Sequence, residues 1–270
     1  MEEFYSIADT YKPLQPSVKG HADGMVYQEI RPVGEIRKYV YCIWQLRTRS
    51  RLSEPYTYRV VSDGCIDIFF DHRHSTDSFI MGFCRKYVAF SIGNDFDYIG
   101  IRFLPGAFPG LFSLNAKKLS NRSVKLDSLL PDLSQWIATH MSIGKSFKVS
   151  AEILEEWLSQ KIMQQKPSFD NRFLKAVIII FEKRGYLDVA TDLDIGLSPR
   201  QLRRVFNYYI GTTPKAFSNV VRFQEVLYAK PSRQSLRKQK FYYDLGFFDQ
   251  AHFIKNFKTF YGITPSEAFG

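Results

Sequence analysis

The spacing of apolar residues changes along the chain from a period of two to a helical period. Between residues 25 and 104, short segments rich in β-branched and aromatic residues are separated by turn signals such as Ser62-Asp63-Gly64. Ile66, Ile68 and Phe70 share one face of such a segment, as expected of a half-buried strand. The number and spacing of the segments favour a small antiparallel β-barrel or sandwich. The predicted strands cover residues 25–31, 41–47, 56–61, 65–71, 79–83, 86–92 and 96–104.

From residue 105 onward the apolar spacing predicts helices, at residues 105–114, 126–141, 150–163 and 171–183. The helix at 150–163 has an apolar stripe, which can pack on the sheet or against its copy in a second subunit. This stripe comprises Ile153, Leu154, Trp157, Leu158 and Ile162, with Lys161 at its edge. The stretch before residue 25 is polar and contains Pro13 and Pro16, which predicts an arm with little structure.

One pattern occurs twice near the end of the chain, with an offset of 51 residues. SPRQLRRVFNYYIGTTP begins at Ser198, and DQAHFIKNFKTFYGITP begins at Asp249. In each copy a glycine turn precedes an N-cap residue and a short helix, which ends at a Gly before a Thr-Pro pair. This order is typical of a helix-turn-helix whose second helix is the recognition helix.

The outer faces of these two helices carry cationic and amide side chains and few carboxylates. Arg and Lys bind phosphates or guanine, and Asn and Gln bind adenine. Solvated basic faces on ordinary amphipathic helices are the alternative, and the matched caps of two copies argue against it. We therefore predict DNA contacts from Arg200, Gln201, Arg203, Arg204, Asn207, Gln250, His252, Lys255 and Asn256.

Residues 174–269 resemble the DNA-binding domain of the AraC/XylS family of bacterial transcription regulators. The resemblance rests on GLSPRQLRRVF (196–206), GTTPKAF (211–217), VVRFQEVLYA (220–229) and above all LGFFDQAHFIKNFKTFYGITP (245–265). It implies two helix-turn-helix units joined by a rigid helix, with both recognition helices in successive major-groove segments. It also implies promoter DNA and RNA polymerase as partners. Since members of the family commonly dimerise through the region around residues 150–163, we favour a homodimer formed by that stripe.

The chain departs from the family pattern at two places. Asp192 stands where the family usually has alanine, so the first unit is expected to be shifted or packed less tightly. Phe241, Tyr242 and Tyr243 stand where smaller aliphatic residues are usual, so the second unit is expected to be displaced.

The first domain resembles, less specifically, the β-rich N-terminal domain of an AraC-family branch whose effector is generally unassigned. PYTYRVVSDGCIDIFFD (55–71) and YIGIRFLPGAFPGLFSL (98–114) carry this resemblance, which implies a regulatory role and does not identify a ligand. A ligand would be expected within or at the mouth of the barrel. The ligand-contact candidates are Trp44, Tyr58, Arg59, Asp67 and Arg102, for each of which a structural role in the core is the alternative.

The net charge of +10 is concentrated at the C-terminal end. Residues 166–270 hold 17 Lys and Arg against 9 Asp and Glu, a net +8, whereas the preceding residues contribute +2. This distribution is typical of a nucleic-acid-binding protein. Three cysteines without paired spacing fit a reducing compartment, and the absence of a signal peptide or a long apolar run predicts a cytoplasmic protein.

Motifs of catalysis or metal binding are lacking. GxSxG, HExxH, P-loop and GxGxxG patterns do not occur. His72 and His74 stand in DHRHSTD, which we interpret as a solvated loop, and His21 falls in the N-terminal arm. We therefore expect no enzyme activity, no metal and no cofactor.

Together these features predict an α+β protein of two domains. Residues 1–165 would form a β-rich regulatory, effector-binding and dimerisation domain with trailing helices, and residues 166–270 an all-α DNA-binding domain with two helix-turn-helix units. The expected function is sequence-specific transcription regulation controlled by a small molecule. A regulator controlled by a protein partner or by its abundance, and a cupin-like metalloenzyme fused to a DNA-binding domain, are the alternatives. The sequence does not decide between activation and repression.

Overall fold

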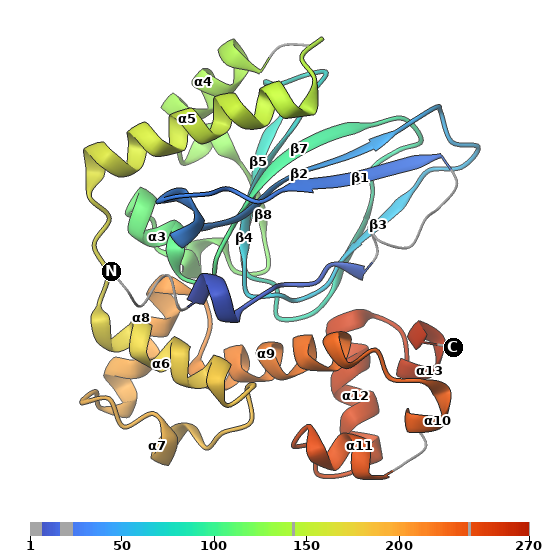
Figure 1. The fold of residues 1–270 in the computed structure, drawn as a ribbon, viewed down its shortest axis with the longest axis vertical. Coiled ribbons are helices and arrows are strands. Elements are labelled where there is room, and N and C mark those ends of the chain that lie inside the picture. Colours follow the sequence, from blue (N-terminus) through green and yellow to red (C-terminus); the bar gives the residue numbers. More distant parts are fainter. Residues whose placement is uncertain (1–6, 17–23, 142–143, 237–238, 270) are drawn as a thin grey trace.

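The computed structural model describes residues 7–16, 24–141, 144–236 and 239–269. It has the predicted α+β architecture: a β-sheet region covered by helices lies against a helical C-terminal region (Figure 1). Buried apolar side chains of both regions form one continuous cluster. Within the described residues, no helix combines the length and apolar character needed to cross a bilayer.

The described part of the N-terminal region contains a six-stranded antiparallel sheet of order β1-β2-β7-β4-β5-β8 and a separate two-stranded ladder of β3 and β6. The seven predicted strands are all present. The strand that was not predicted, β8, has three residues and no hydrophobic run. The bounds are β1 Met25–Ile30, β2 Val40–Thr48, β3 Thr57–Val60, β4 Ile66–Asp71, β5 Ser78–Met81, β6 Val88–Ser91, β7 Asp97–Phe103 and β8 Ser123–Lys125.

The expectation of a barrel is wrong, and the alternative of two facing layers is closer to the structure. β1 and β8 end the larger sheet at opposite edges, and β3 and β6 pair with each other instead of bridging those edges. The strands therefore do not close into a barrel. A barrel needs every strand to pair on both sides, and the two-stranded second layer does not supply those pairings.

The alternation of the strands gives the larger sheet two different faces. Ile68, Ile101 and Phe103 point to the helical side, where Phe103 contacts Phe108 of α3 with ring centroids 5.5 Å apart. The opposite face is turned towards the β3–β6 ladder and carries aromatic side chains together with Asp67 and Arg102. Helices of this region are α3 (Ala107–Phe112), α4 (Pro131–His140) and α5 (Phe147–Gln165), with single turns η1 (Ile36–Lys38), η2 (Ala116–Leu119) and η3 (Leu126–Ser128).

The apolar stripe of α5 packs within its own chain. Leu154, Leu158 and Ile162 are buried, and the Trp157 ring stacks on Phe112 of α3 at 6.3 Å. The preference for this stripe as a dimer interface is therefore wrong. Sequence alone could not decide this, because the sheet region and a second subunit offer chemically equivalent apolar surfaces.

The C-terminal region contains the two predicted helix-turn-helix units. The recognition helices are α8 (Pro199–Tyr209) and α12 (Gln250–Tyr261), joined through α9 (Pro214–Ala229). The 16 residues of α9 span about 24 Å at ~1.5 Å per residue. The remaining helices are α6 (Asn171–Glu182), α7 (Val189–Asp192), α10 (Arg233–Leu236), α11 (Gln239–Asp244) and α13 (Pro265–Phe269).

The N-terminal segment is more ordered than predicted. Tyr11 is buried and stacks on Phe181 of α6, with ring centroids 4.4 Å apart and planes at 7°. Gln15 is 2% exposed and hydrogen-bonds to Val61 through both its side-chain oxygen and nitrogen. The expectation of an unstructured arm is thus wrong for residues 7–16, whose contacts lie far away in the sequence. Residues 1–6 and 17–23 lie outside the described part of the chain.

Glycines allow the two regions to approach closely. Gly64, in the loop after β3, has φ +78°, and a Cβ there would lie 2.7 Å from the Phe217 ring of α9. Gly106, before α3, similarly receives the ring of Phe173 from α6, which a Cβ at this glycine would approach to 2.6 Å. Aromatic rings of the C-terminal region therefore fill spaces that only glycine leaves open.

We expect Gly64→Ala to destabilise the protein more than Gly93→Ala. Both glycines have positive φ, but nothing lies within 4 Å of a Cβ at Gly93. Backbone strain should lower the free energy of unfolding by about 1–2 kcal/mol in both variants. Overpacking against Phe217 should add about 1–3 kcal/mol in Gly64→Ala. Urea denaturation measures both values, and equal losses would contradict the close contact.

Candidate nucleic-acid interface and ligand cavity

The first recognition helix, α8, begins with a capping box. The Ser198 hydroxyl accepts a hydrogen bond from the Gln201 backbone N–H at 3.3 Å, and the Gln201 side chain accepts one from the Ser198 N–H at 2.9 Å. Leu202 and Phe206 are buried, which turns the opposite face of the helix outward. Arg200, Arg203 and Arg204 are exposed on that face.

The second recognition helix, α12, repeats this arrangement with different residues. Asp249 caps it by accepting from the His252 backbone N–H at 2.6 Å, and His252 Nδ1 accepts from the Phe248 N–H at 3.4 Å. His252 lies 51 residues after Gln201, so the offset of the sequence repeat relates the two capping side chains. Phe253, Phe257 and Phe260 are buried.

The predicted DNA-contacting residues are brought to the surface with two exceptions. Arg200, Gln201, Arg203, Arg204, Gln250, His252 and Lys255 are exposed. Asn207 and Asn256 are half-buried: the Asn207 amide donates to the Arg203 carbonyl at 2.8 Å, and Asn256 Oδ1 is buried without a hydrogen-bond partner in the described structure. Gln201 and His252 also hold the helix ends, a role that the sequence pattern did not separate from base contact.

Arg222 connects the joining helix α9 to the turn of the second unit. Its Nη1 donates to the Gly246 carbonyl at 2.8 Å, its Nη2 donates to Asn219 at 2.9 Å, and its guanidinium lies 4.6 Å from the Phe247 ring centroid. Burial lowers the pKa of Arg222. This side chain fixes the turn before α12 against α9, and no pattern in the sequence signals that role.

Local contacts accommodate the two departures from the family pattern. Asp192 ends the single turn of α7, where its Oδ2 accepts from the Asp188 N–H at 2.8 Å and its Oδ1 pairs with Lys183 at 2.7 Å. The Lys183 ammonium lowers the pKa of Asp192. Tyr242 is buried and its ring stacks on Phe253 at 6.3 Å, whereas Tyr243 is exposed. The side chain of Phe241 lies outside the described residues.

A cavity of about 230 Å³ lies between the β3–β6 ladder and the face of the larger sheet that carries Asp67 and Arg102. Aromatic rings make up much of its wall. Four of the five ligand candidates line it: Trp44, Tyr58, Asp67 and Arg102. Arg59 does not line it, because neighbouring residues of a strand point to opposite faces; its guanidinium lies 5.8 Å from the Tyr87 ring centroid.

The Trp44 ring reaches Asp67 by passing over a glycine. Trp44 on β2 pairs with Gly100 on β7, and a Cβ at Gly100 would lie 2.3 Å from the indole. The indole Nε1 donates to Asp67 Oδ2 at 3.2 Å on the next strand, β4. Gly100 therefore allows the ring to lie flat in the cavity wall.

Arg102 is buried between two carboxylates. Its Nε and Nη2 donate to Asp67 at 3.1 and 2.8 Å, and its Nε lies 3.6 Å from Asp63 Oδ2. Burial alone would lower the pKa of Arg102, but Asp67 and Asp63 raise it above its usual range. Burial raises the pKa of the Asp67 carboxyl, and Arg102 opposes this rise.

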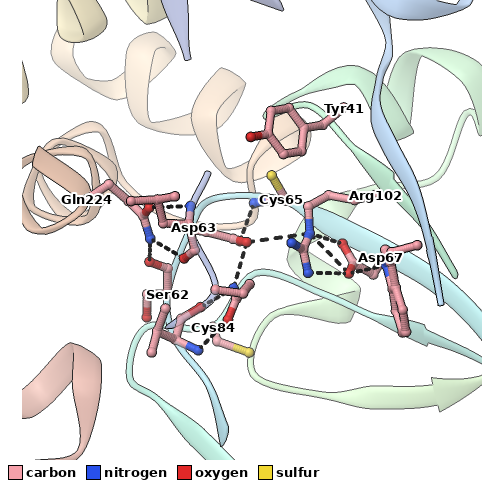
Figure 2. A network of polar contacts seen from close by, with 12 residues as sticks. Tyr41, Ser62, Asp63, Cys65, Asp67, Cys84, Arg102 and Gln224 are labelled. Carbon is pink, nitrogen blue, oxygen red and sulfur yellow. Dashed lines mark hydrogen bonds and ion pairs between the residues drawn. The ribbon is translucent and has the colours of Figure 1, made fainter. Parts of the chain in front are cut away.

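Asp63 links the cavity to the C-terminal region (Figure 2). Its Oδ2 accepts from Gln15 Nε2 at 2.7 Å, and its backbone carbonyl accepts from Tyr11 at 2.6 Å. The neighbouring Ser62 carbonyl accepts from Gln224 Nε2 of α9 at 2.8 Å. In the sequence this aspartate is only part of a turn signal, because its partners Gln15 and Tyr11 lie 48 and 52 positions away.

His72 is not a solvated loop residue. It is buried, with Nδ1 3.2 Å from Asp97 and Nε2 3.4 Å from the Ser150 hydroxyl of α5, so the interpretation of this residue was wrong. His74 is exposed, and His21 lies outside the described residues. In the described part of the chain, no group of three or more His, Cys, Asp and Glu side chains is placed to hold a metal ion.

Comparisons with known proteins match the two regions separately. Residues 28–125 match a family described as a domain of unknown function (DUF6597), and residues 194–269 match one described as a helix-turn-helix domain. No curated protein has a matching sequence.

Solved structures of ToxT from Vibrio cholerae resemble the chain remotely. One from strain O395 has 14% identity and a TM-score of 0.38, covering 81% of this chain and 94% of its own. ToxT bound to (E)-4-(8-methylnaphthalen-1-yl)but-3-enoic acid has 10% identity and a TM-score of 0.44, covering 92% and 98%. Wild-type ToxT bound to an unsaturated fatty acid has 10% identity and a TM-score of 0.41, covering 92% and 95%. Nothing about the ligand of this chain follows from so remote a likeness.

We expect Cys42, Cys65 and Cys84 to resist alkylation in the native protein. Burial raises the pKa of all three thiols, that of Cys84 to about 12, so at about pH 8.5 they stay protonated whereas the reactive form is the thiolate. Mass spectrometry after iodoacetamide treatment should find the native chain unlabelled and the chain in guanidinium labelled at all three positions. Rapid native labelling of Cys84 would contradict the burial of its thiol.

Proposed function

We propose that this chain is a transcription regulator of the AraC/XylS type that binds specific promoter sites through α8 and α12, since residues 194–269 match a helix-turn-helix family. The two capped helices with exposed cationic faces, joined by α9, carry this proposal. Phosphate contacts would supply affinity, and side chains at the groove would supply specificity. We place the domain boundary after Gln165, where α5 ends.

The N-terminal domain would control the relative placement of the two units. It touches each of them near the C-terminal end of the recognition helix: the Tyr87 N–H donates to the Thr259 carbonyl at 3.2 Å, and the Ser120 hydroxyl donates to the Gly211 carbonyl. It also holds α9 between them through Gln224. A change in the N-terminal domain would therefore reach both recognition helices at once.

A small molecule in the cavity would be the signal. A regulator that responds only to a protein partner or to its own abundance predicts a core filled by side chains, and the cavity beside Arg102 favours a ligand instead. A homodimer would have to use a surface other than the buried stripe of α5. Contact with RNA polymerase remains an expectation from the family.

We expect Arg200→Ala and Arg204→Ala each to weaken binding to the preferred duplex by about 1–3 kcal/mol. The preferred duplex is first selected from random DNA with the full chain, and fluorescence anisotropy then measures its affinity and that of a scrambled duplex. Affinity for the scrambled duplex should fall less, because these side chains are proposed to contact bases.

Lys148→Ala is the matched control, because Lys148 is an exposed cation on α5, in the N-terminal domain. It should leave both affinities unchanged. Equal losses on preferred and scrambled duplexes would show that the two arginines contact phosphates only. A wild-type chain that selects no preferred duplex would overturn the proposed function.

We expect Gln224→Met to loosen the contact between the domains. The Gln224 side chain accepts from the Leu14 N–H at 2.8 Å and donates to the Ser62 carbonyl at 2.8 Å, so its loss leaves both groups unpaired. The free energy of unfolding should fall by about 1–3 kcal/mol. Amide hydrogen exchange should accelerate at Leu14, whereas Gln160→Met, on the exposed side of α5, should change neither value.

A further inference from the structure

We propose that the cavity of the N-terminal domain binds a compact molecule that carries one positive charge on an aromatic or apolar body, such as an arylalkyl ammonium. This inference rests on the proposed function, in which a ligand of that cavity is the signal. It adds the chemical class of the ligand, which follows from the charges, the wall and the size of the cavity.

The charges of the cavity leave one negative charge unbalanced. Of the described residues that line it, Arg102 is the one cationic side chain, and Asp63 and Asp67 are the acidic ones. Arg102 is already bound by Asp67 through its Nε and Nη2 and lies near Asp63. A ligand ammonium would balance the third charge, whereas a ligand carboxylate would add a further unpaired negative charge to a desolvated site.

Hydrogen-bond donors surround both acidic groups. Asp67 accepts from the Arg102 guanidinium and the Trp44 indole, and Asp63 accepts from the Cys65 N–H and from Gln15. Every one of these partners is a donor, which suits a carboxylate that has acceptors only. Each carboxylate oxygen has more than one lone pair, so a ligand N–H can also bind there, in competition with the donors already present.

The aromatic wall of the cavity suits the aromatic or apolar body of such a ligand. Aromatic faces attract cations because of their negative quadrupole, an effect that grows when water is excluded. The ring of Trp44 also lies beside the carboxylate of Asp67, which places aromatic surface and negative charge together. The rings that line the cavity are those of Trp44, Tyr58, Phe69, Phe79, Phe90 and Tyr98.

The size of the cavity limits the ligand to a small molecule. A cavity of about 150 Å³ is enough to bind benzene. The volume of about 230 Å³ therefore suits a single or fused ring with a short side chain, and excludes a long chain that stays extended. An ammonium beside Asp63 would compete with Arg102 and Gln15 for that carboxylate. This competition would act on the loop that α9 contacts through Gln224 (Figure 2).

The test compares three probes that share one ring and chain length and differ in charge: tryptamine, tryptophol and indole-3-propionate. Isothermal titration calorimetry with the full chain measures their dissociation constants. We expect tryptamine to bind at least tenfold more tightly than tryptophol, and indole-3-propionate to bind most weakly. Equal or tighter binding of the carboxylate, or no binding of any probe at millimolar concentration, overturns the assignment.

Two variants test whether the preference for the ammonium probe arises in the cavity. Asp67→Asn removes one carboxylate and should reduce the ratio of the tryptophol and tryptamine dissociation constants at least tenfold. Asp71 lies on the same face of β4 but outside the cavity, so the control variant Asp71→Asn should preserve this ratio. If Asp67→Asn does not fold, Asp63→Asn serves the same purpose, and the probe comparison on the wild-type chain stands by itself. An unchanged advantage in the folded variant contradicts the proposal. Selection of a preferred DNA duplex is measured separately, so failure of the DNA-binding function and failure of this assignment are distinguishable.

Discussion

The contact between the middle of α9 and the loop after β3 is the constraint on which the rest of the structure depends. Gln224 is fully buried in this contact, and both ends of its amide are used, by Leu14 and by Ser62. A buried amide that loses a hydrogen-bond partner destabilises the folded state. The contact is therefore restricted to the geometry that satisfies both ends of the amide. Since α9 lies between the two helix-turn-helix units, fixing its middle constrains the position of both units.

Close packing around this contact makes the two domains one unit. Glycine at position 64 allows the Phe217 ring to enter, and Tyr11 of the N-terminal segment covers Phe181. The N-terminal region thus does not act as a separate body on a flexible tether. Interior packing is close to that of a crystal, which favours discrete alternative arrangements over gradual deformation. A ligand that shifts the loop after β3 would select between such arrangements.

In the recognition helices and in the cavity, polar side chains are held by hydrogen bonds within the protein before any partner binds. Gln201 and His252 close the N-terminal turns of their helices, which holds the neighbouring cationic residues in a defined position. In the cavity, Trp44 and Arg102 hold Asp67 in place in the same way. Such pre-organisation lowers the entropy cost of binding, because few rotamers remain to be fixed.

The sequence by itself determined the local elements of this protein. Short β-branched and aromatic segments between turn signals predicted all seven of the longer strands. The repeat of Ser198 and Asp249 predicted two capped helices, because caps and amphipathic faces depend on neighbours within four residues. It also identified Trp44, Asp67 and Arg102 as cavity residues. Only the tertiary structure decided that the sheet stays open, that the α5 stripe is covered in its own chain, and that His72 is buried. The sequence did not reveal the roles of Asp63, Arg222 and Gln224 for the same reason. These roles are set by partners up to 210 positions away, and no local spacing carries that information.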